Sequence, residues 1–339
     1  MIAYFDRLAV PDHYKSKMDV RETEIAIKLI KDLVENQIAD TLNLTRVSAP
    51  LYVRPETGLN DNLNGVERPV SFDIKDIDAQ VEVVQSLAKW KRMALARYGF
   101  NPGEGLYTDM NAIRRDEELD NMHSVYVDQW DWEKIITREE RTTATLQAVV
   151  LDLYRCFCRI ENHILRYYPF LDRKLPADLF FISSQELEDL YPDLNPRQRE
   201  DRICAEKRAV FVSQIGEKLK SGQSHDGRAP DYDDWQLNGD LLFWYPTLNR
   251  SFEVSSMGIR VDEISMREQL AKANCADRMT LDFHQKILQG ALPYTIGGGI
   301  GQSRTCMFYL DKAHIGEVQT SVWPDKMQAD CQRFGINLL

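Results

Sequence analysis

A glycine-rich run with the sequence TIGGGIGQSR, at Thr295–Arg304, is one of the segments best suited to chemistry. Its glycines leave no side chains to block the close approach of a ligand. The helix predicted to follow would offer free backbone N–H groups to an anion. The run is neither a Walker loop nor a GxGxxG fingerprint. Taken alone, it supports an anion site and a glycine-rich bulge in a packed strand about equally.

A predicted antiparallel hairpin, with strands at 106–114 and 123–132, carries a second group of polar residues. Successive side chains of a strand point to opposite faces. One face of the second strand therefore carries Ser124, Tyr126, Asp128, Trp130 and Trp132, and the other carries Val125, Val127, Gln129 and Asp131. Neither face has the apolar–polar split of a half-buried strand. The pattern indicates a concave site in which carboxylate and amide groups orient a substrate; the alternative is a solvated strand end.

Two positions suit phosphate or metal binding. Arg114, followed by Arg115 and Asp116, ends the first strand of the hairpin and is a candidate phosphate ligand. The alternative is a solvated hairpin tip. Glu253, in a predicted strand at 251–261, is a candidate ligand for Mg²⁺, which prefers one or two carboxylates plus substrate phosphates. The alternative is a solvent-facing strand edge.

Two further positions suit an amino-acid substrate. Lys91 interrupts an apolar row in a predicted helix at 86–98 and would either extend to water or bind a carboxylate in a pocket. The acidic cluster at 231–234 would hold an ammonium group or form a solvated loop. The six histidines show no ligand spacing, and we interpret them as structural.

The elements that must position these residues are mostly hairpins and helices. A long amphipathic helix is predicted from Asp19 to about Leu42, leading into an edge strand at 47–53 that contains Pro50. Further strands are predicted at 70–74, 180–182, 209–215, 241–245 and 251–261, and further helices at 264–273, 280–289 and about 304–310. Because hairpins outnumber regular βαβ units, we expect an α/β (α+β) fold with a mostly antiparallel sheet flanked by helices. We expect one domain over 1–339.

Composition narrows the class of protein. With 43% hydrophobic and 28% charged residues, the chain of 339 residues resembles an ordinary globular enzyme. It has no apolar stretch long enough for a membrane span and no secretory signal pattern, so we expect a cytoplasmic protein without a membrane partner. The net charge of −11 counts against nucleic acid as a partner. The six cysteines lack a CxxC pair, which favours plain thiols.

Seven sequence strings, taken together, resemble a known family. They are SLAKWKR at 86–92, GEGLYT at 103–108, HSVYVDQWDWE at 123–133, RAPDYDDW at 228–235, LNGD at 237–240, SSMGIRVD at 255–262 and TIGGGIGQSR at 295–304. These strings are similar to the signatures of asparagine synthetase A (aspartate–ammonia ligase), in the order of that family and over roughly positions 15 to 325. The resemblance implies a catalytic core like that of class II aminoacyl-tRNA synthetases. It assigns 19–53 to a dimer interface.

The resemblance also implies a reaction and a set of site residues. ATP would activate aspartate as β-aspartyl-adenylate, and ammonia would then release AMP and form asparagine, with Mg²⁺ on the phosphates. Arg114 and Arg304, with Glu253, Gly299 and Gly301, would bind ATP, and Asp240 with Glu253 would carry the metal. The residues implied for aspartate are Ser86, Lys91, Gln129, Asp131, Asp233, Ser256 and Arg260. Asp61, in the string DNLNG, is the candidate for attracting ammonium and taking its proton.

Two features depart from the related synthetases and family members. The related synthetases usually have an acidic residue at the position of Ser303, whereas asparagine synthetase A has a serine there, as this chain does. The connection from Trp235 to Leu237 is short, and the sequence does not define the conformation of that loop. The alternatives are an aspartyl- or asparaginyl-tRNA synthetase and a non-catalytic paralogue that binds an amino acid or nucleotide. The acidic charge disfavours the first, and the presence of Arg114, Glu253 and Arg304 disfavours the second. A glutamine-dependent synthetase is disfavoured because Met1 is followed by Ile2 rather than by a cysteine.

Overall fold

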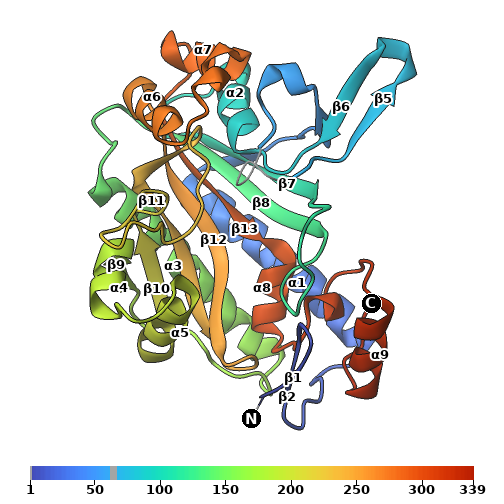
Figure 1. The fold of residues 1–339 in the computed structure, drawn as a ribbon. Coiled ribbons are helices and arrows are strands. Elements are labelled where there is room, and N and C mark those ends of the chain that lie inside the picture. The colour runs from blue at the N-terminus through green and yellow to red at the C-terminus, as the bar shows by residue number, and fades with distance from the viewer. Residues whose placement is uncertain (1, 62–66) are drawn as a thin grey trace.

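A central sheet organises the molecule. The computed structural model describes residues 2–61 and 67–339, and in this part of the chain the sheet has eight strands in the order β3-β7-β8-β13-β12-β11-β10-β9 (Figure 1). Its strands are β3 (Leu44–Arg46), β7 (Gly105–Ile113), β8 (Tyr126–Ile135), β9 (Phe180–Ser183), β10 (Ala209–Ser213), β11 (Asp233–Tyr245), β12 (Arg250–Arg260) and β13 (Thr295–Gly301). Neighbours from β7 to β10 are antiparallel, and only the edge strands β3 and β9 pair in parallel. The predicted sheet is thus confirmed.

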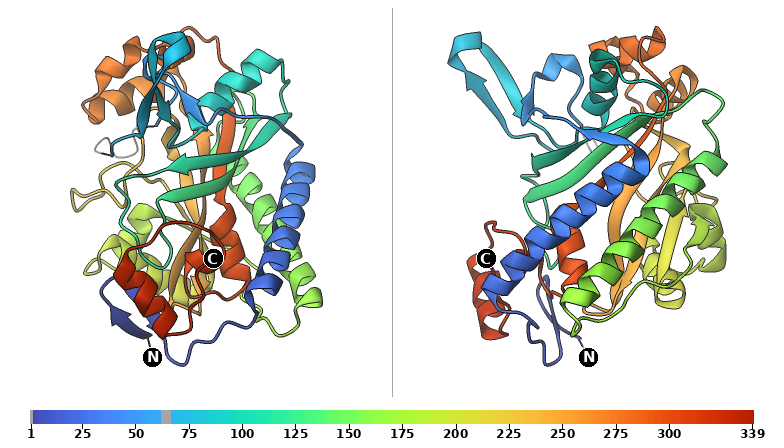
Figure 2. Two further views of the ribbon diagram at one scale, coloured as in Figure 1. Left: turned by 90° about the vertical axis from the view of Figure 1, so that its right-hand side faces the viewer. Right: turned by 180° about the vertical axis from the view of Figure 1, so that it is seen from behind.

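Long helices cover one face of this sheet. The helices α1 (Val20–Leu42) and α3 (Thr143–Tyr167) run side by side behind it, next to α8 (Gln302–Tyr309) (Figure 2). Their apolar residues form the largest core with Trp130 and Trp132, whose side chains are 1% and 0% exposed. The α1 helix begins where the Asp19 side chain accepts a hydrogen bond from the Glu22 N–H. This face of the sheet is therefore closed by packing.

The other face is covered only at its two ends. At one end lie α4 (Ser184–Leu190) and α5 (Pro196–Lys207), whose apolar residues pack with β9, β10 and β11. At the other end lie α2 (Ala88–Tyr98), α6 (Glu263–Lys272) and α7 (Asp282–Leu288), as Figure 1 shows. The middle of this face is left for the polar residues of β8, β12 and β13.

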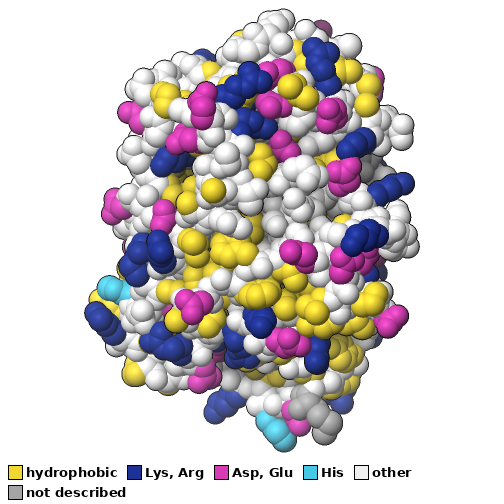
Figure 3. Space-filling view, turned by 90° about the vertical axis from the view of Figure 1, so that its left-hand side faces the viewer, with side chains coloured by type: hydrophobic (Ala, Val, Ile, Leu, Met, Phe, Trp, Pro, Cys, Tyr) yellow, Lys and Arg dark blue, Asp and Glu magenta, His cyan; other side chains and the backbone are white. Residues whose placement is uncertain are grey.

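Smaller elements lie at the periphery. A three-stranded sheet of β4 (Tyr52–Val53), β6 (Ala79–Val83) and β5 (Ser71–Ile74) projects from the body (Figure 1). The hairpin of β1 (Ile2–Phe5) and β2 (Leu8–Pro11) lies near the C-terminal helix α9 (Asp325–Arg333). No helix within residues 2–61 and 67–339 is long and apolar enough to cross a membrane. On the face shown in Figure 3, Lys and Arg side chains are interspersed with Asp and Glu.

Several predicted boundaries need correction. The edge strand expected at 47–53 is wrong in its limits, because β3 ends at Arg46 and only Tyr52–Val53 pair again, in the small sheet. Pro50 lies in the gap, where it cannot donate a backbone hydrogen bond. The connection at 235–237 is not a loop, because β11 is continuous from Asp233 with a shift in its pairing to β12. The helix α3, which is 25 residues long, was not predicted as an element.

Candidate functional site

A polar cavity of about 400 Å³ opens on the partly covered face of the sheet. Along β8, Trp130 and Trp132 point into the core with α1 and α3, whereas Gln129 and Asp131 line the cavity. The structure brings nearly all the predicted site residues into this lining: Asp61, Ser86, Lys91, Arg114, Gln129, Asp131, Asp233, Glu253, Ser256, Arg260, Gly299, Gly301 and Arg304. Of the predicted residues, Asp240 lies outside it. The rest of the DNLNG string, 62–65, lies outside the described residues.

The deepest part of the site is a buried ion-pair network. Glu133 is 0% exposed and accepts hydrogen bonds from Arg260 Nε at 3.0 Å and Arg260 Nη2 at 2.8 Å. It also accepts one from the Thr295 hydroxyl at 2.6 Å. Arg260 donates further to Asp233. Although burial acts in the opposite direction, these arginine contacts keep the pKa of Glu133 below its usual range. The network holds the Arg260 guanidinium in one place.

Lys91 joins this network from helix α2. Its ammonium group donates to the carbonyls of Trp132 and Gly298, both at 3.0 Å, and lies 3.5 Å from the Asp131 carboxylate. Burial is the main influence on its pKa, which is lowered. The lysine therefore points into the protein rather than to solvent, and it ties β8 to β13. A further contact with a substrate carboxylate stays a prediction.

The floor of the cavity is formed by the backbone of β13. A Cβ atom on Gly299 would lie 2.7 Å from Asp131 Oδ1 and 2.8 Å from Gln129 Oε1, and one on Gly297 would collide with Glu133. Larger residues would displace the side chains that line the site. The glycines of the TIGGGIG segment thus lie within the strand itself and leave its surface open to a ligand.

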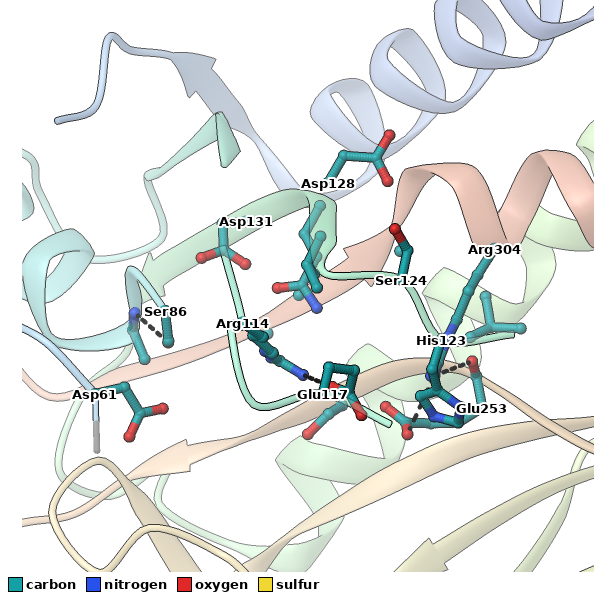
Figure 4. A pocket seen from close by; sticks show the side chains of 18 of the residues that line it. Asp61, Ser86, Arg114, Glu117, His123, Ser124, Asp128, Asp131, Glu253 and Arg304 are labelled. Atoms are coloured by element: carbon teal, nitrogen blue, oxygen red, sulfur yellow. Dashed lines mark hydrogen bonds and ion pairs between the residues drawn. The ribbon is translucent and has the colours of Figure 1, made fainter. Parts of the chain in front are cut away.

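Two arginines occupy the other part of the cavity. Arg304, in the first turn of α8, donates to the backbone oxygen of Glu253 at 3.2 Å and to its carboxylate at 3.4 Å. Arg114 follows β7 and lies 4.0 Å from Glu117. Its buried Nε has no hydrogen-bond partner among the described residues. Figure 4 shows Asp61, Ser86 and Asp131 on one side, Arg304 and Glu253 on the other, and Arg114 between them.

Carboxylates near these two arginines are suitable ligands for a cation that is also bound to phosphate groups. The Glu253 side chain is 45% exposed, and although burial opposes the change, Arg304 and Arg228 lower its pKa. Within the described ranges there is no ready cluster of three or more His, Cys, Asp or Glu residues for a metal ion. Asp240 instead accepts a hydrogen bond from Arg228 Nη2 at 2.6 Å. Burial and Glu253 raise the pKa of Asp240 to about 7.

Sequence reasoning missed several residues of the cavity lining, among them His123 and Arg228. His123 was interpreted as structural, yet it lines the cavity, with its Nδ1 2.8 Å from Asp120. Arg228 donates to Ser256 and Asp240 and also lines the cavity. Arg228 is the first residue of the RAPDYDDW string, so the resemblance pointed to this segment without giving Arg228 a role. For His123, the signal was its place at the start of the predicted strand 123–132, although β8 itself begins at Tyr126.

Solved structures with the same fold define the broad class. Asparaginyl-tRNA synthetase from Pyrococcus horikoshii, complexed with asparaginyl-adenylate, matches 89% of this chain and 70% of its own, with a TM-score of 0.65 and 14% identity. Aspartyl-tRNA synthetase from Entamoeba histolytica matches 88% of this chain and 58% of its own, with a TM-score of 0.60 and 14% identity. The fold is that of the class II aminoacyl-tRNA synthetases.

Sequence comparison identifies the family. The family model described as aspartate–ammonia ligase matches residues 21–335. The aspartate–ammonia ligase of Ruminiclostridium cellulolyticum is 63% identical over 98% of this chain and 99% of its own. The aspartate–ammonia ligase of Lactobacillus johnsonii is 58% identical over 98% of this chain and 99% of its own length. The chain belongs to the aspartate–ammonia ligase family and is an enzyme.

Proposed function

We propose that this enzyme joins L-aspartate and ammonia to form L-asparagine at the expense of ATP, by way of β-aspartyl-adenylate. The β-carboxylate of aspartate attacks the α-phosphorus of ATP and releases pyrophosphate. Ammonia then attacks the activated carbonyl carbon, and AMP leaves. Family membership supports the substrates. The order of groups in the cavity supports the route, because Arg114 lies between the Ser86–Asp131 side and Arg304.

That order of groups is the observation that carries the proposal. In an adenylation, the α-phosphorus must lie between the attacking carboxylate and the two phosphates that leave. Arg114 stabilises charge on the α-phosphate, and Arg304 holds the γ-phosphate. The buried, unpaired Nε of Arg114 fits an anionic ligand, because such a group is costly to leave unsatisfied. We further propose that the whole chain, 1–339, acts as one catalytic domain.

Aspartate binds on the opposite side of the cavity in this proposal. Ser86, Gln129, Asp131 and Ser256 supply polar contacts, and the fixed guanidinium of Arg260 faces a substrate carboxylate. Asp233 neutralises the substrate amino group. The half-exposed Glu253 would hold a Mg²⁺ ion bound to the ATP phosphates, and that ion would neutralise part of their charge. Asp240 would be a second ligand if its hydrogen bond with Arg228 opened.

The route is tested by following both nucleotide products and the fate of oxygen. Purified enzyme with aspartate, ATP and ammonium should form asparagine, AMP and pyrophosphate in equal amounts. Aspartate labelled with ¹⁸O in its β-carboxylate should transfer one labelled oxygen to AMP, because that carboxylate oxygen bridges to phosphorus in the adenylate. Stoichiometric ADP, or unlabelled AMP, would contradict the adenylate.

Free ammonia should be the nitrogen source. We expect glutamine to be ineffective. Because only unprotonated ammonia is a nucleophile, we expect the rate at fixed total ammonium to climb from about pH 6 to about pH 8, unless Asp61 removes the proton within the site. If Asp61 takes the proton of bound ammonium, the Asp61→Asn variant should use ammonia less well while it still releases pyrophosphate. The measurement is asparagine formed with each donor, beside pyrophosphate release.

The control for the nitrogen experiment is ammonia-free glutamine, since traces of ammonia would imitate use of glutamine. Glu56→Gln, which changes an exposed carboxylate outside the cavity lining, serves as the matched variant for Asp61. Equal activity with purified glutamine would overturn the proposed donor. An Asp61→Asn enzyme that loses both half-reactions equally would contradict the role given to Asp61.

We also propose a homodimer paired through 19–53. Val20 and Ile25 on α1, and Leu51 and Tyr52 beyond it, are large apolar side chains that this chain leaves 44–58% exposed. Sedimentation should therefore give twice the monomer mass of 39.3 kDa. Ile25→Asp combined with Leu51→Asp should shift the equilibrium to monomer. Val322→Asp, at an apolar residue 71% exposed outside this region, should not. A fully active monomer at micromolar concentration would refute the pairing.

A further inference from the structure

The first turn of helix α8 is not capped by the side chain of the residue that precedes the helix. Arg304 is the third residue of this helix, and the residue before the helix is Gly301, which has no side chain to accept from the first N–H groups. The guanidinium hydrogen bonds of Arg304 in the described structure are long contacts with Glu253, at 3.2 and 3.4 Å. The place of this guanidinium therefore depends mainly on how the backbone of the turn is held.

Asp128 of strand β8 supplies the missing cap from across the fold. Its Oδ1 accepts the Ser303 N–H at 3.1 Å, and its Oδ2 accepts the Ser303 hydroxyl at 2.7 Å. The carboxylate thus makes two bonds to the residue immediately before Arg304. Asp128 is 7% exposed and Ser303 is 2% exposed, so water competes little for these bonds. Figure 4 shows Asp128 near helices α1 and α8.

Two further side chains complete this arrangement. The Gln319 amide, 5% exposed, donates to Asp128 Oδ1 at 3.2 Å and to the Ser303 hydroxyl at 3.1 Å. Lys31 of α1 lies with its ammonium nitrogen 3.5 Å from Asp128 Oδ2. We name Asp128, Ser303 and Gln319 the capping cluster. Each member bonds both of the others, so the turn is fixed by three parts of the chain that are distant in sequence.

We propose that Asp128 is a positioning residue for ATP, which acts by holding Arg304 in place through the capping cluster. This inference rests on the proposed function, in which Arg304 holds the γ-phosphate. In the proposed function aspartate binds beside the Glu133–Arg260–Asp233 network, whose hydrogen bonds join residues other than those of the capping cluster. Loss of the Asp128 carboxylate should therefore weaken the use of ATP and leave the use of aspartate nearly intact.

The first test is Asp128→Asn, which keeps the shape of the side chain but replaces one acceptor oxygen with a donor. We expect the KM for ATP to rise about tenfold, the size of a lost hydrogen bond to a charged group, while the KM for aspartate changes by less than about twofold. Glu188→Gln is the matched control, because Glu188 is also a buried carboxylate, bonded to Arg199 and Ser221 outside the cavity. It should leave both KM values unchanged.

The second test separates the two bonds of the carboxylate. Ser303→Ala removes only the hydroxyl and leaves the backbone N–H of residue 303 able to donate to Asp128 Oδ1, so it should raise the KM for ATP by less than Asp128→Asn does. If Asp128→Asn does not fold, Asp128→Glu, which keeps the charge but displaces it, should show the same selective rise. Equal rises in both KM values, or a larger rise for Ser303→Ala than for Asp128→Asn, would overturn the proposal. Failure of the unchanged enzyme to form asparagine from ATP would instead contradict the proposed function.

Discussion

Replacing Arg304 with Ala should slow pyrophosphate release from ATP and aspartate by about 10²–10³-fold, the loss typical of removing one donor to transition-state charge. The guanidinium lies in the cavity, is 22% exposed and pairs with the carboxylate of Glu253, whose side chain is 45% exposed. Its removal should therefore leave the fold intact, with an unchanged melting temperature. The measurement is the initial rate of pyrophosphate formation at saturating aspartate.

Two variants make the Arg304 result specific. Arg304→Lys keeps the charge but not the planar fork of donors, so it should recover only part of the rate. Arg138→Ala removes an exposed arginine that pairs with Glu263 at 2.8 Å outside the cavity lining, and it should react normally. Near-normal pyrophosphate release by Arg304→Ala would refute the role of this arginine in binding ATP.

Removing Glu133 should have the largest effect on stability. In Glu133→Ala the buried guanidinium of Arg260 loses its three hydrogen bonds to this carboxylate and keeps the one to Asp233. Breaking a buried pair from one side costs about 3–5 kcal/mol, because a buried charge is left uncompensated. We expect the free energy of unfolding to fall by about this amount. Urea unfolding followed by tryptophan fluorescence provides the measurement.

An exposed ion pair supplies the comparison for Glu133. Arg155 and Asp152 pair on the outer surface of α3, with side chains 65% and 47% exposed. Arg155→Ala should change the free energy of unfolding by less than about 1 kcal/mol, as is usual for surface pairs. If Glu133→Ala were no more damaging than Arg155→Ala, the Glu133–Arg260 pair would not be a stabilising part of the site.

The fold was predictable where local patterns decide the structure. The hairpin of β7 and β8 and the helix α2 both follow from short-range signals, and both are confirmed. Helix α3 carried such a signal too, since Leu146, Val150 and Leu153 share one face, and it was overlooked. The early start of β11 had no local signal, because its polar first residues are stabilised by pairing with β12.

The site was predictable in membership but not in its internal pairing. Family resemblance pointed to Arg260, Glu253 and Lys91, and the structure places all three at one cavity. Which charge meets which depends on contacts between segments far apart in sequence. The pairing of Arg228 with Asp240, and of Lys91 with the carbonyls of β8 and β13, therefore could not be inferred from residue types or spacing.

The order of strands in the central sheet has a consequence for synthesis of the chain on the ribosome. The last strand in sequence, β13, lies in the middle, between β8 and β12. Until Thr295–Gly301 has emerged, β3-β7-β8 and β12-β11-β10-β9 are two half-sheets that lack the strand between them, and β8 and β12 present unpaired edges. Such edges invite aggregation of a nascent chain. We expect truncated chains that end before residue 295 to be inactive and insoluble, and growing chains to depend on chaperones until translation is nearly complete.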